Sequence, residues 1–420
     1  MVSPRLAGFR PVTAVATAAA RILGQAMQLR WAALLILAVG ATGGAARAQE
    51  EIDPQKPRRL YTEHTGRAVE GALRWLASRQ NRGSGDANGS WSAKVGFKIN
   101  DGYRLQPRDQ PDDGLPHLGV SALAGMAFLS GGHLPGQGPY GEVMDRALDF
   151  VLRSVQEDGQ ITAYKTRMYS HAFSLLFLAE VYGMTGRPDL REHIDRAVEF
   201  TYKSQNERGG WRYAPLARDS DMSITVCQVV ALREARNIGI RVPRKTIDKA
   251  LKYVMESAVT PPNSDSGAFL YQHREVPFNR NSFALTAAGL TTIYQAGLYS
   301  DRAVVRFCRD HNIKRVPRIS HCLSYLNRQY EAVWMDYSDH YFFYYGNYYA
   351  AQAMYTHGGR AWERWYGMVR DDLLQIATQR GSTGGREFYW HSKHVGDVFP
   401  TAVAAIILQV PKNYLPIFQR

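Results

Sequence analysis

Helical segments of two kinds alternate along the chain, and this alternation restricts the available folds most strongly. Segments of the first kind have one apolar face, because apolar residues recur at intervals of three and four. They begin at Thr62 and recur at residues 142–154, 190–204, 245–257, 319–329 and 362–378. Segments of the second kind are apolar nearly all round, at residues 120–129, 171–182, 223–236, 282–295, 348–355 and 401–409. A helix without a polar face is buried on all sides.

The two kinds of helix form pairs that recur about every 50 residues, a spacing typical of repeat architectures. An open solenoid usually carries polar caps. The last helix, residues 402–408, is wholly apolar and cannot face water. We therefore predict an all-α fold, an α/α toroid of about six helical hairpins. The apolar helices form its inner ring and the amphipathic helices its outer ring. Residues 300–317 are expected to add a further helix or a lid-like insertion.

The first 48 residues predict export. Residues 31–46 carry no charge, follow Arg30 and lead into the small-residue site Ala46-Arg47-Ala48, which is the order of a secretory signal. The apolar run is shorter than the roughly 20 residues of a membrane-spanning helix, and an uncleaved anchor is the alternative. We expect a signal over residues 1–48, a linker over 49–61 and one toroid domain over 62–420. The protein would then be periplasmic, attached to the cell surface or secreted.

Composition excludes several classes of partner. The formal net charge of +13 is spread along the chain without a block of Lys or Arg, so no nucleic-acid partner is expected. Among the three cysteines, Cys227 lies in an apolar segment, whereas Cys308 and Cys322 could form a disulfide in an exported protein. No Cys-x-x-Cys pair occurs, which argues against a thiolate zinc site. No cofactor is predicted, and the oligomeric state stays open.

A glutamine and a tryptophan mark several turns between the two kinds of helix. The motifs are Gly71-x-x-x-Trp75-Leu76-x-x-x-Gln80 with Gly89-Ser90-Trp91, Phe200-x-x-x-x-Gln205 with Gly209-Gly210-Trp211, and a degenerate copy at Leu374, Gln379, Gly385 and Trp390. The pattern resembles the Gln-Trp repeat of squalene cyclases, and through it the prenyltransferase and squalene-oxidase repeat family. This resemblance implies an α/α toroid that holds an apolar, isoprenoid-type ligand in a central cavity.

The segment Asp219-Ser220-Asp221-Met222 is the sharpest candidate for chemistry. Resemblance to the Asp-x-Asp-Asp motif of squalene cyclases implies that Asp221 and Asp219 are the catalytic acids. Met222 stands where the third acid would be, so ligand binding is favoured over cyclisation. Alternatively, Asp221 or Ser220 caps the helix that follows, because Asp and Ser are favoured at that position.

Five further residues are predicted to contact the ligand. They are His171, Trp211, Tyr213, Tyr341 and Tyr345, the last two from an aromatic-rich run over residues 334–349. Aromatic faces attract carbocations and also fill ordinary helix cores, so core packing is the alternative for the tyrosines. Polar residues that begin the inner helices either ring one mouth of the toroid or cap their own helices.

No metal is expected. The stretch from Asp339 to Tyr344 contains no cysteine, which argues against a zinc prenyltransferase, and His391-x-x-His394-x-x-Asp397 lies in a polar loop typical of surface histidines. Two other functional classes stay open. A carbohydrate-active enzyme needs two acids, or an acid and a Tyr or His, across an open polar groove. A non-catalytic interaction module would be favoured by a filled central cavity.

Overall fold

The computed structural model describes residues 60–94, 114–272, 282–381, 385–392 and 394–418. The chain divides into two compact units, Met1–Pro54 and Gln55–Arg420, and the first lies wholly outside the described residues. The predicted secretory signal and most of the predicted linker also lie outside them. No helix among the described residues is long and apolar enough to cross a membrane.

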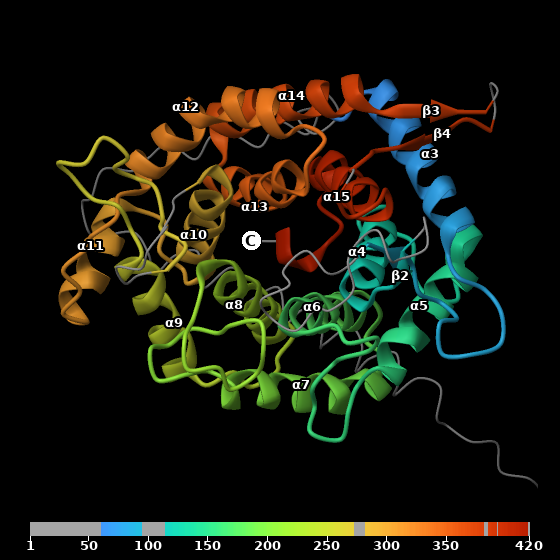
Figure 1. The fold of residues 1–420 in the computed structure, drawn as a ribbon, viewed down its shortest axis with the longest axis horizontal. Helices are drawn as coiled ribbons and strands as arrows, with labels where there is room; N and C mark the ends of the chain where they lie inside the picture. The colour runs from blue at the N-terminus through green and yellow to red at the C-terminus, as the bar shows by residue number, and fades with distance from the viewer. Residues whose placement is uncertain (1–59, 95–113, 273–281, 382–384, 393, 419–420) are drawn as a thin grey trace, which may run out of the picture. The chain divides into compact units, whose positions relative to one another are not determined.

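Twelve of the described helices pair as six hairpins in two concentric rings, which confirms the predicted α/α toroid (Figure 1). The inner helices are α4 (Leu118–Leu129), α6 (Met168–Thr185), α8 (Met222–Asn237), α10 (Phe283–Gln295), α13 (Tyr341–His357) and α15 (Val398–Gln409). The outer helices are α3 (Glu63–Arg79), α5 (Gly141–Arg153), α7 (Arg191–Lys203), α9 (Arg244–Glu256), α12 (Ile319–Tyr337) and α14 (Gly359–Ile376). Each inner helix packs on the next, and α15 packs on α4, so the inner ring is closed.

Smaller elements complete the described fold. The predicted additional helix is α11 (Asp301–Asp310), which lies between α10 and α12. The short strands form two antiparallel pairs. Strand β1 (Ser92–Ala93) pairs with β2 (Leu115–Pro116), and β3 (Thr378–Arg380) pairs with β4 (Glu387–Tyr389). The single-turn 3₁₀ helices are η3 (Gly138–Tyr140), η4 (Pro188–Leu190), η5 (Val410–Lys412) and η6 (Pro416–Phe418). Cys308 and Cys322 are buried free thiols, so the disulfide that the sequence left open is not formed.

The turn from each outer helix to its inner partner is a repeated joint that begins with glycine in four of the described hairpins. Gly89, Gly159, Gly209 and Gly267 have φ of 88°, 88°, 88° and 99°, a region that favours glycine. A Cβ on each would lie 1.9 to 2.3 Å from a backbone carbonyl oxygen of the next outer helix. The joint therefore holds neighbouring hairpins together by direct backbone contact.

The glycine of one joint can be tested against a matched glycine. We expect Gly209→Ala to lower the free energy of unfolding by at least about 2 kcal/mol, because left-handed backbone strain adds to the clash with the Lys249 carbonyl oxygen. Gly239→Ala is the control, since Gly239 has φ of 85° but nothing within 4 Å of its Cβ position. Urea denaturation of both variants measures the difference. Equal losses would show that the close approach contributes nothing.

The residue two positions after the joint glycine is buried and connects the joint to the inner helix. Its backbone N–H donates to a side chain in the first turn of that helix. The pairs are Trp91 with Ser121 Oγ, Ile161 with His171 Nδ1, Trp211 with Thr225 Oγ1, Phe269 with Thr286 Oγ1 and, after β4, Trp390 with Thr401 Oγ1. The indole N–H groups of the three tryptophans donate to carbonyl oxygens of the preceding outer helices, at Leu76, Thr201 and Leu373.

The glutamines of the Gln-Trp motif also form hydrogen bonds to backbone carbonyl oxygens. Gln80 Nε2 donates to the carbonyl oxygens of Gly89 and Val143 at 3.2 and 2.9 Å, and Gln205 Nε2 donates to those of Gly209 and Thr246 at 2.8 and 2.9 Å. Each glutamine thus ties its own joint to the next outer helix. The repeated motif therefore has a structural role in the joints of the ring.

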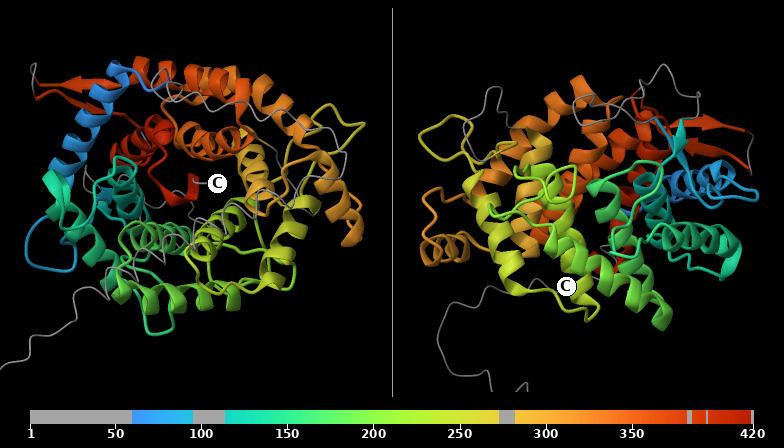
Figure 2. Two further views of the ribbon diagram at one scale, coloured as in Figure 1. Left: turned by 180° about the vertical axis from the view of Figure 1, so that it is seen from behind. Right: turned by 60° about the horizontal axis from the view of Figure 1, so that its bottom comes forward.

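Aromatic side chains cross the interior of the inner ring. Phe173 of α6 meets Tyr348 of α13 with ring centroids 6.0 Å apart, and Tyr169 meets Tyr345 at 6.4 Å, although α6 and α13 stand on opposite sides of the ring. The C-terminal segment lies inside the ring in the view from behind (Figure 2), and η6 packs on α6, α8 and α13. At these levels the interior is occupied by tyrosine, phenylalanine and C-terminal residues.

Candidate functional site

The charged residues of the candidate site stand where the joint of the third hairpin meets the start of α8. Asp221 is the N-cap of α8, and its Oδ1 accepts a hydrogen bond from the Ile224 N–H at 2.9 Å. Its backbone N–H donates to the Trp211 carbonyl oxygen at 3.0 Å, which places Asp221 next to the joint. Asp221 therefore caps its helix, as one reading of the sequence proposed, and it also has a second oxygen available for a charged partner.

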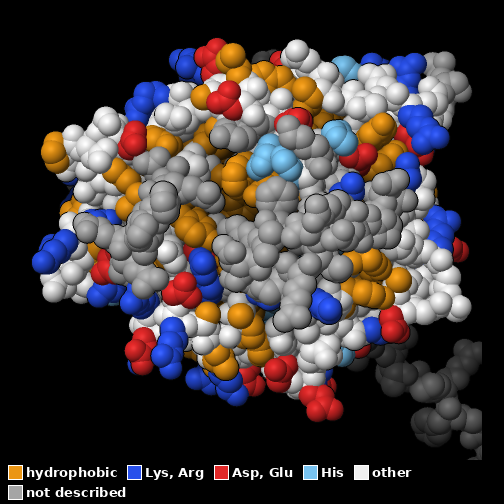
Figure 3. All heavy atoms as spheres, viewed as in Figure 1, with side chains coloured by type: hydrophobic (Ala, Val, Ile, Leu, Met, Phe, Trp, Pro, Cys, Tyr) orange, Lys and Arg blue, Asp and Glu red, His pale blue; other side chains and the backbone are white. Residues whose placement is uncertain are grey.

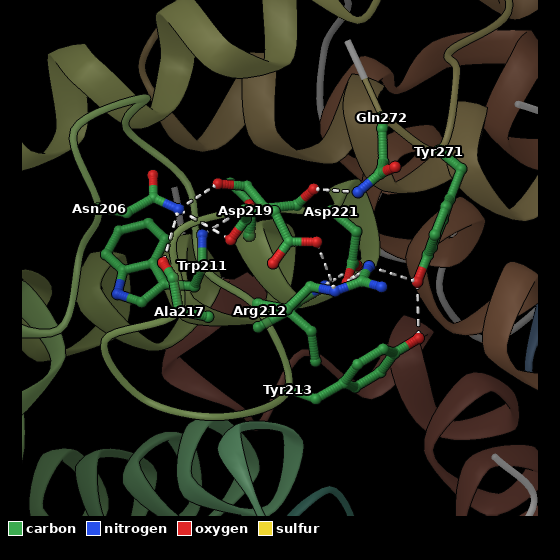
Figure 4. A network of polar contacts seen from close by, with 12 residues as sticks. Asn206, Trp211, Arg212, Tyr213, Ala217, Asp219, Asp221, Tyr271 and Gln272 are labelled. Atoms are coloured by element: carbon green, nitrogen blue, oxygen red, sulfur yellow. Dashed lines mark hydrogen bonds and ion pairs between the residues drawn. The ribbon is translucent and has the colours of Figure 1, made fainter. Parts of the chain in front are cut away.

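That partner is Arg212, which directly follows the joint tryptophan (Figure 4). Arg212 Nη1 donates to Asp221 Oδ2 at 2.9 Å and to the Tyr271 hydroxyl at 3.0 Å, and its Nε lies 3.4 Å from Asp219 Oδ2. Burial alone would lower the pKa of Arg212, but the charges around it, chiefly that of Asp221, raise it, so the guanidinium stays charged. One guanidinium thus joins both acids of the segment.

The two acids differ in their access to solvent. The side chain of Asp221 is fully buried, whereas that of Asp219 is 38% exposed. Both oxygens of Asp221 accept hydrogen bonds, from Ile224 and from Arg212. Asp219 is held through its backbone, because its carbonyl oxygen accepts from Asn206 Nδ2 at 2.8 Å. Asp219 is consequently the acid whose carboxylate a ligand can reach.

Two tyrosines extend the network toward the neighbouring hairpin. The hydroxyls of Tyr213 and Tyr271 are 2.6 Å apart, and the Arg212 guanidinium lies 4.8 Å from the centre of the Tyr213 ring. Burial and then the charge of Asp221 raise the pKa of both tyrosines, so both keep their protons. Gln272 Nε2 donates to the Ser220 carbonyl oxygen at 2.9 Å and fixes the acidic segment from the same side.

The structure brings only part of the predicted site together. Tyr213 belongs to the network around Asp219 and Asp221, and Tyr345 lies in the interior, where its hydroxyl donates to the Ser223 carbonyl oxygen at 3.4 Å. Tyr341 begins α13, and its ring lies 4.3 Å from that of His340. The ring of Tyr169 lies 6.1 Å from that of Tyr213 and 6.4 Å from that of Tyr345, so Tyr345 stands close to the network.

His171 and Trp211 serve the joints. Both ring nitrogens of His171 are hydrogen-bonded, Nδ1 to the Ile161 N–H at 3.0 Å and Nε2 to Thr201 Oγ1 at 2.8 Å. Burial lowers the pKa of His171 to about 4, so the ring is neutral near pH 7. Trp211 is 2% exposed, and its indole donates to the Thr201 carbonyl oxygen. Both side chains are buried and hydrogen-bonded within the joints.

Sequence reasoning missed Arg212 and Tyr271, yet the repeat contains a signal for both. Tyr213 stands two residues after the joint residue Trp211, and Tyr271 two residues after Phe269. The two tyrosines therefore occupy the same position in adjacent joints. Arg212 stands between the joint residue Trp211 and Tyr213 in the sequence. No group of three or more His, Cys, Asp or Glu in the described part of the chain is arranged to hold a metal ion.

Comparison with known proteins gives a likeness of fold. No protein-family model matches the chain, and no curated protein does. Similar solved structures include an inactive GH76A α-1,6-mannanase of Salegentibacter sp. HEL1_6 in complex with α-1,6-mannotriose (9% identity, TM-score 0.54, 83% of this chain and 99% of that chain). Cellobiose 2-epimerase from Spirochaeta thermophila DSM 6192 (10%, 0.56, 86% and 98%) and the GH76 α-mannanase from Bacteroides thetaiotaomicron (12%, 0.53, 86% and 98%) are also similar. These likenesses show a shared toroid fold.

The resemblance to squalene cyclases and prenyltransferases is wrong. Structural neighbours include mannanases and an epimerase, and the Gln-Trp motif that suggested the resemblance forms joints between the helices of the ring. The predicted apolar, isoprenoid-type ligand is wrong for a related reason. The neighbour crystallised with a ligand holds an oligosaccharide, and here tyrosines and the C-terminal segment occupy the interior.

Proposed function

We propose that this protein is a carbohydrate-active enzyme whose site is built around Asp219, Arg212 and Asp221. The observation that carries the proposal is the buried pairing of Arg212 with Asp221, which leaves the neighbouring Asp219 carboxylate exposed. Sugars present many hydroxyls, and a carboxylate accepts their hydrogen bonds while a guanidinium and phenols donate to their oxygens. The similarity of fold to mannanases and to cellobiose 2-epimerase supports this class of ligand.

Each residue has a distinct part in the proposed site. Asp219 contacts the saccharide and acts as its carboxylate catalyst, the role that glycoside-processing enzymes assign to Asp or Glu. Asp221 is a positioning residue, because both of its oxygens hold protein groups. Tyr213 and Tyr271 stay protonated and donate hydrogen bonds. The proposal includes export through the N-terminal signal, consistent with a polysaccharide substrate outside the cell.

Asp219→Asn tests this function. We expect wild-type protein to bind at least one of α-1,6-mannotriose and cellobiose in calorimetry and to convert it, followed by chromatography of the products. Asp219→Asn should lower kcat by about 100-fold or more, because it removes a catalytic carboxylate while keeping the side chain's shape. Asp248→Asn, on outer helix α9, is the matched control and should leave kcat unchanged. Binding of neither sugar, or an unchanged kcat in Asp219→Asn, would contradict the proposal.

A non-catalytic interaction module is the second candidate. The observation in its favour is the aromatic filling of the ring interior by Phe173, Tyr348, Tyr169 and Tyr345. A module of this kind would bind a saccharide or a protein without converting it. Binding of a sugar by wild-type protein with no product formed would select this candidate over the enzyme.

A further inference from the structure

The joint of the sixth hairpin repeats the charged arrangement of the third. Trp211 is followed by Arg212 and Trp390 by His391, and both tryptophans donate their backbone N–H to a threonine of the inner helix that follows. Asp221 is the N-cap of α8, and Asp397 is the N-cap of α15. In the third and sixth hairpins, a basic side chain after the joint therefore pairs with an aspartate at the start of the inner helix.

The two pairs approach the ring axis from opposite sides. The inner helices contact one another in the order α4, α6, α8, α10, α13, α15 and back to α4. Helices α8 and α15 are thus three steps apart in either direction, as Figure 1 shows. Because each joint leads into the start of an inner helix, Arg212 with Asp221 and His391 with Asp397 lie at the same end of the ring, at the starts of two helices on opposite sides of it.

Asp397 orients the imidazole of His391. Its Oδ1 lies 2.7 Å from His391 Nδ1, and it makes no capping hydrogen bond to α15, unlike Asp221 in α8. A carboxylate at Nδ1 fixes the proton there and leaves the lone pair on Nε2. The side chain of His391 is 60% exposed, against 22% for Arg212, so Nε2 is open to a ligand.

The surroundings of His391 are aromatic and basic. The rings of His340 and His394 are 4.4 Å apart, Tyr341 lies 6.3 Å from His394, and the Tyr344 hydroxyl donates to the His391 carbonyl oxygen at 3.5 Å. Figure 3 shows histidine side chains grouped near the centre of the face turned to the viewer, beside apolar side chains. Among the described residues around this loop, Asp397 is the acid in contact with His391.

We propose that His391 is a second catalytic residue of the same site, and that Asp397 is its positioning residue. This inference rests on the function proposed above. In hydrolysis, His391 Nε2 takes a proton from a water as the water oxygen bonds to the anomeric carbon and the bond from that carbon to the leaving-group oxygen breaks. The imidazolium that forms is stabilised by the Asp397 carboxylate through Nδ1–H. The same proton then returns from Nε2 to an oxygen of the product, so the imidazole is neutral again. Asp219 and His391 provide the acid and the His across the site that carbohydrate chemistry needs.

The orientation of His391 is tested first, without any sugar. In histidine labelled with ¹⁵N, two-bond proton–nitrogen spectra at about pH 8 should show neutral His391 with its proton on Nδ1, assigned by the signal lost in His391→Gln. Asp397→Asn should shift the signal toward the Nε2–H tautomer. His311→Gln, which alters the C-cap histidine of α11, should remove a different signal. A proton on Nε2 in wild-type protein, or no change in Asp397→Asn, would overturn the proposal.

Catalysis is tested second, with α-1,6-mannotriose and cellobiose as probes. We expect His391→Gln to lower kcat by about 100-fold or more with the sugar's Kd within about threefold of wild type. Bound sugar should also protect His391 from diethyl pyrocarbonate, measured by peptide mass spectrometry. If Asp219→Asn abolishes turnover while His391→Gln retains it, this inference fails and the proposed function stands. If wild-type protein binds neither sugar, both fail.

Discussion

Replacing Arg212 with methionine is expected to lower the free energy of unfolding by about 3 kcal/mol, because it leaves a buried carboxylate without its partner. Asp221 is fully buried, and Arg212 Nη1 forms an ion pair with its Oδ2 at 2.9 Å. The N-cap hydrogen bond from Ile224 remains, so the helix itself should persist. Urea denaturation near neutral pH measures the loss, and saccharide binding should weaken in the same variant.

Matched variants separate the pair from its surroundings. Arg208→Met removes an exposed arginine from the same loop and should change the free energy of unfolding by less than about 0.5 kcal/mol. The double variant Arg212→Met with Asp221→Asn should recover much of the loss, since asparagine also caps helices and carries no charge. If Arg212→Met is as stable as Arg208→Met, the ion pair does not hold this joint.

Raising the pH from about 4.5 to 7 is expected to destabilise the protein through a buried carboxyl pair beneath the C-terminal segment. Glu180 and Glu234 are both fully buried, and Glu180 Oε1 accepts the Ile417 N–H at 3.3 Å. Burial raises the pKa of Glu234 to about 7, and burial with the charge of Glu234 raises that of Glu180 well above its usual value. Arg233 partly opposes the shift of Glu234, and Tyr348 also lies near Glu180.

The sign follows from proton binding. Between the ordinary and the raised pKa the folded state holds a proton that the unfolded state has released, so stability falls as pH rises through this window and is level above it. Glu234→Gln keeps the site uncharged, and its side-chain oxygen can still accept from Asn237 Nδ2. At about pH 8 this variant should be more stable than wild type by up to about 3 kcal/mol.

The exposed Glu192 supplies the control for the pH prediction. Glu192→Gln, on outer helix α7, should leave the pH dependence of the free energy of unfolding as it is in wild type. Denaturation curves at about pH 5 and pH 8 for the three proteins give the comparison. The prediction is wrong if Glu234→Gln loses as much stability between the two pH values as wild type does.

The ring could be predicted because its determinants are local in sequence. Apolar residues all round residues 120–129 or 402–408 can be buried only inside a layer of other helices, and the repeated Gly-x-Trp joint is readable from neighbouring residues. The same locality misled the choice of family. A Gln and a Trp at a joint serve structural contacts of the ring, since Gln80 and Gln205 donate to backbone carbonyl oxygens of the next outer helix.

The site could be predicted only in part. Asp219 and Asp221 stood out because two acids precede an apolar helix, and that position is visible in the sequence. His171 was predicted to contact the ligand, and a polar residue in the first turn of an inner helix can turn toward the axis or toward its own joint. The structure shows that it accepts the joint N–H of Ile161, as Thr225 accepts that of Trp211. His391 and Asp397 were predicted to lie in a polar loop typical of surface histidines, and the structure shows that they pair with each other.

The sequence by itself determined the all-α class, the pairing of helices, the closure of the ring and the position of the acids at the entrance of α8. Tertiary structure alone decided that Arg212 binds Asp221, that Tyr271 joins Tyr213 from 58 residues away, and that aromatic residues of α6 and α13 meet inside the ring. The physical reason is that an inner helix is buried on every side, so no hydrophobic pattern marks which of its faces turns toward the axis.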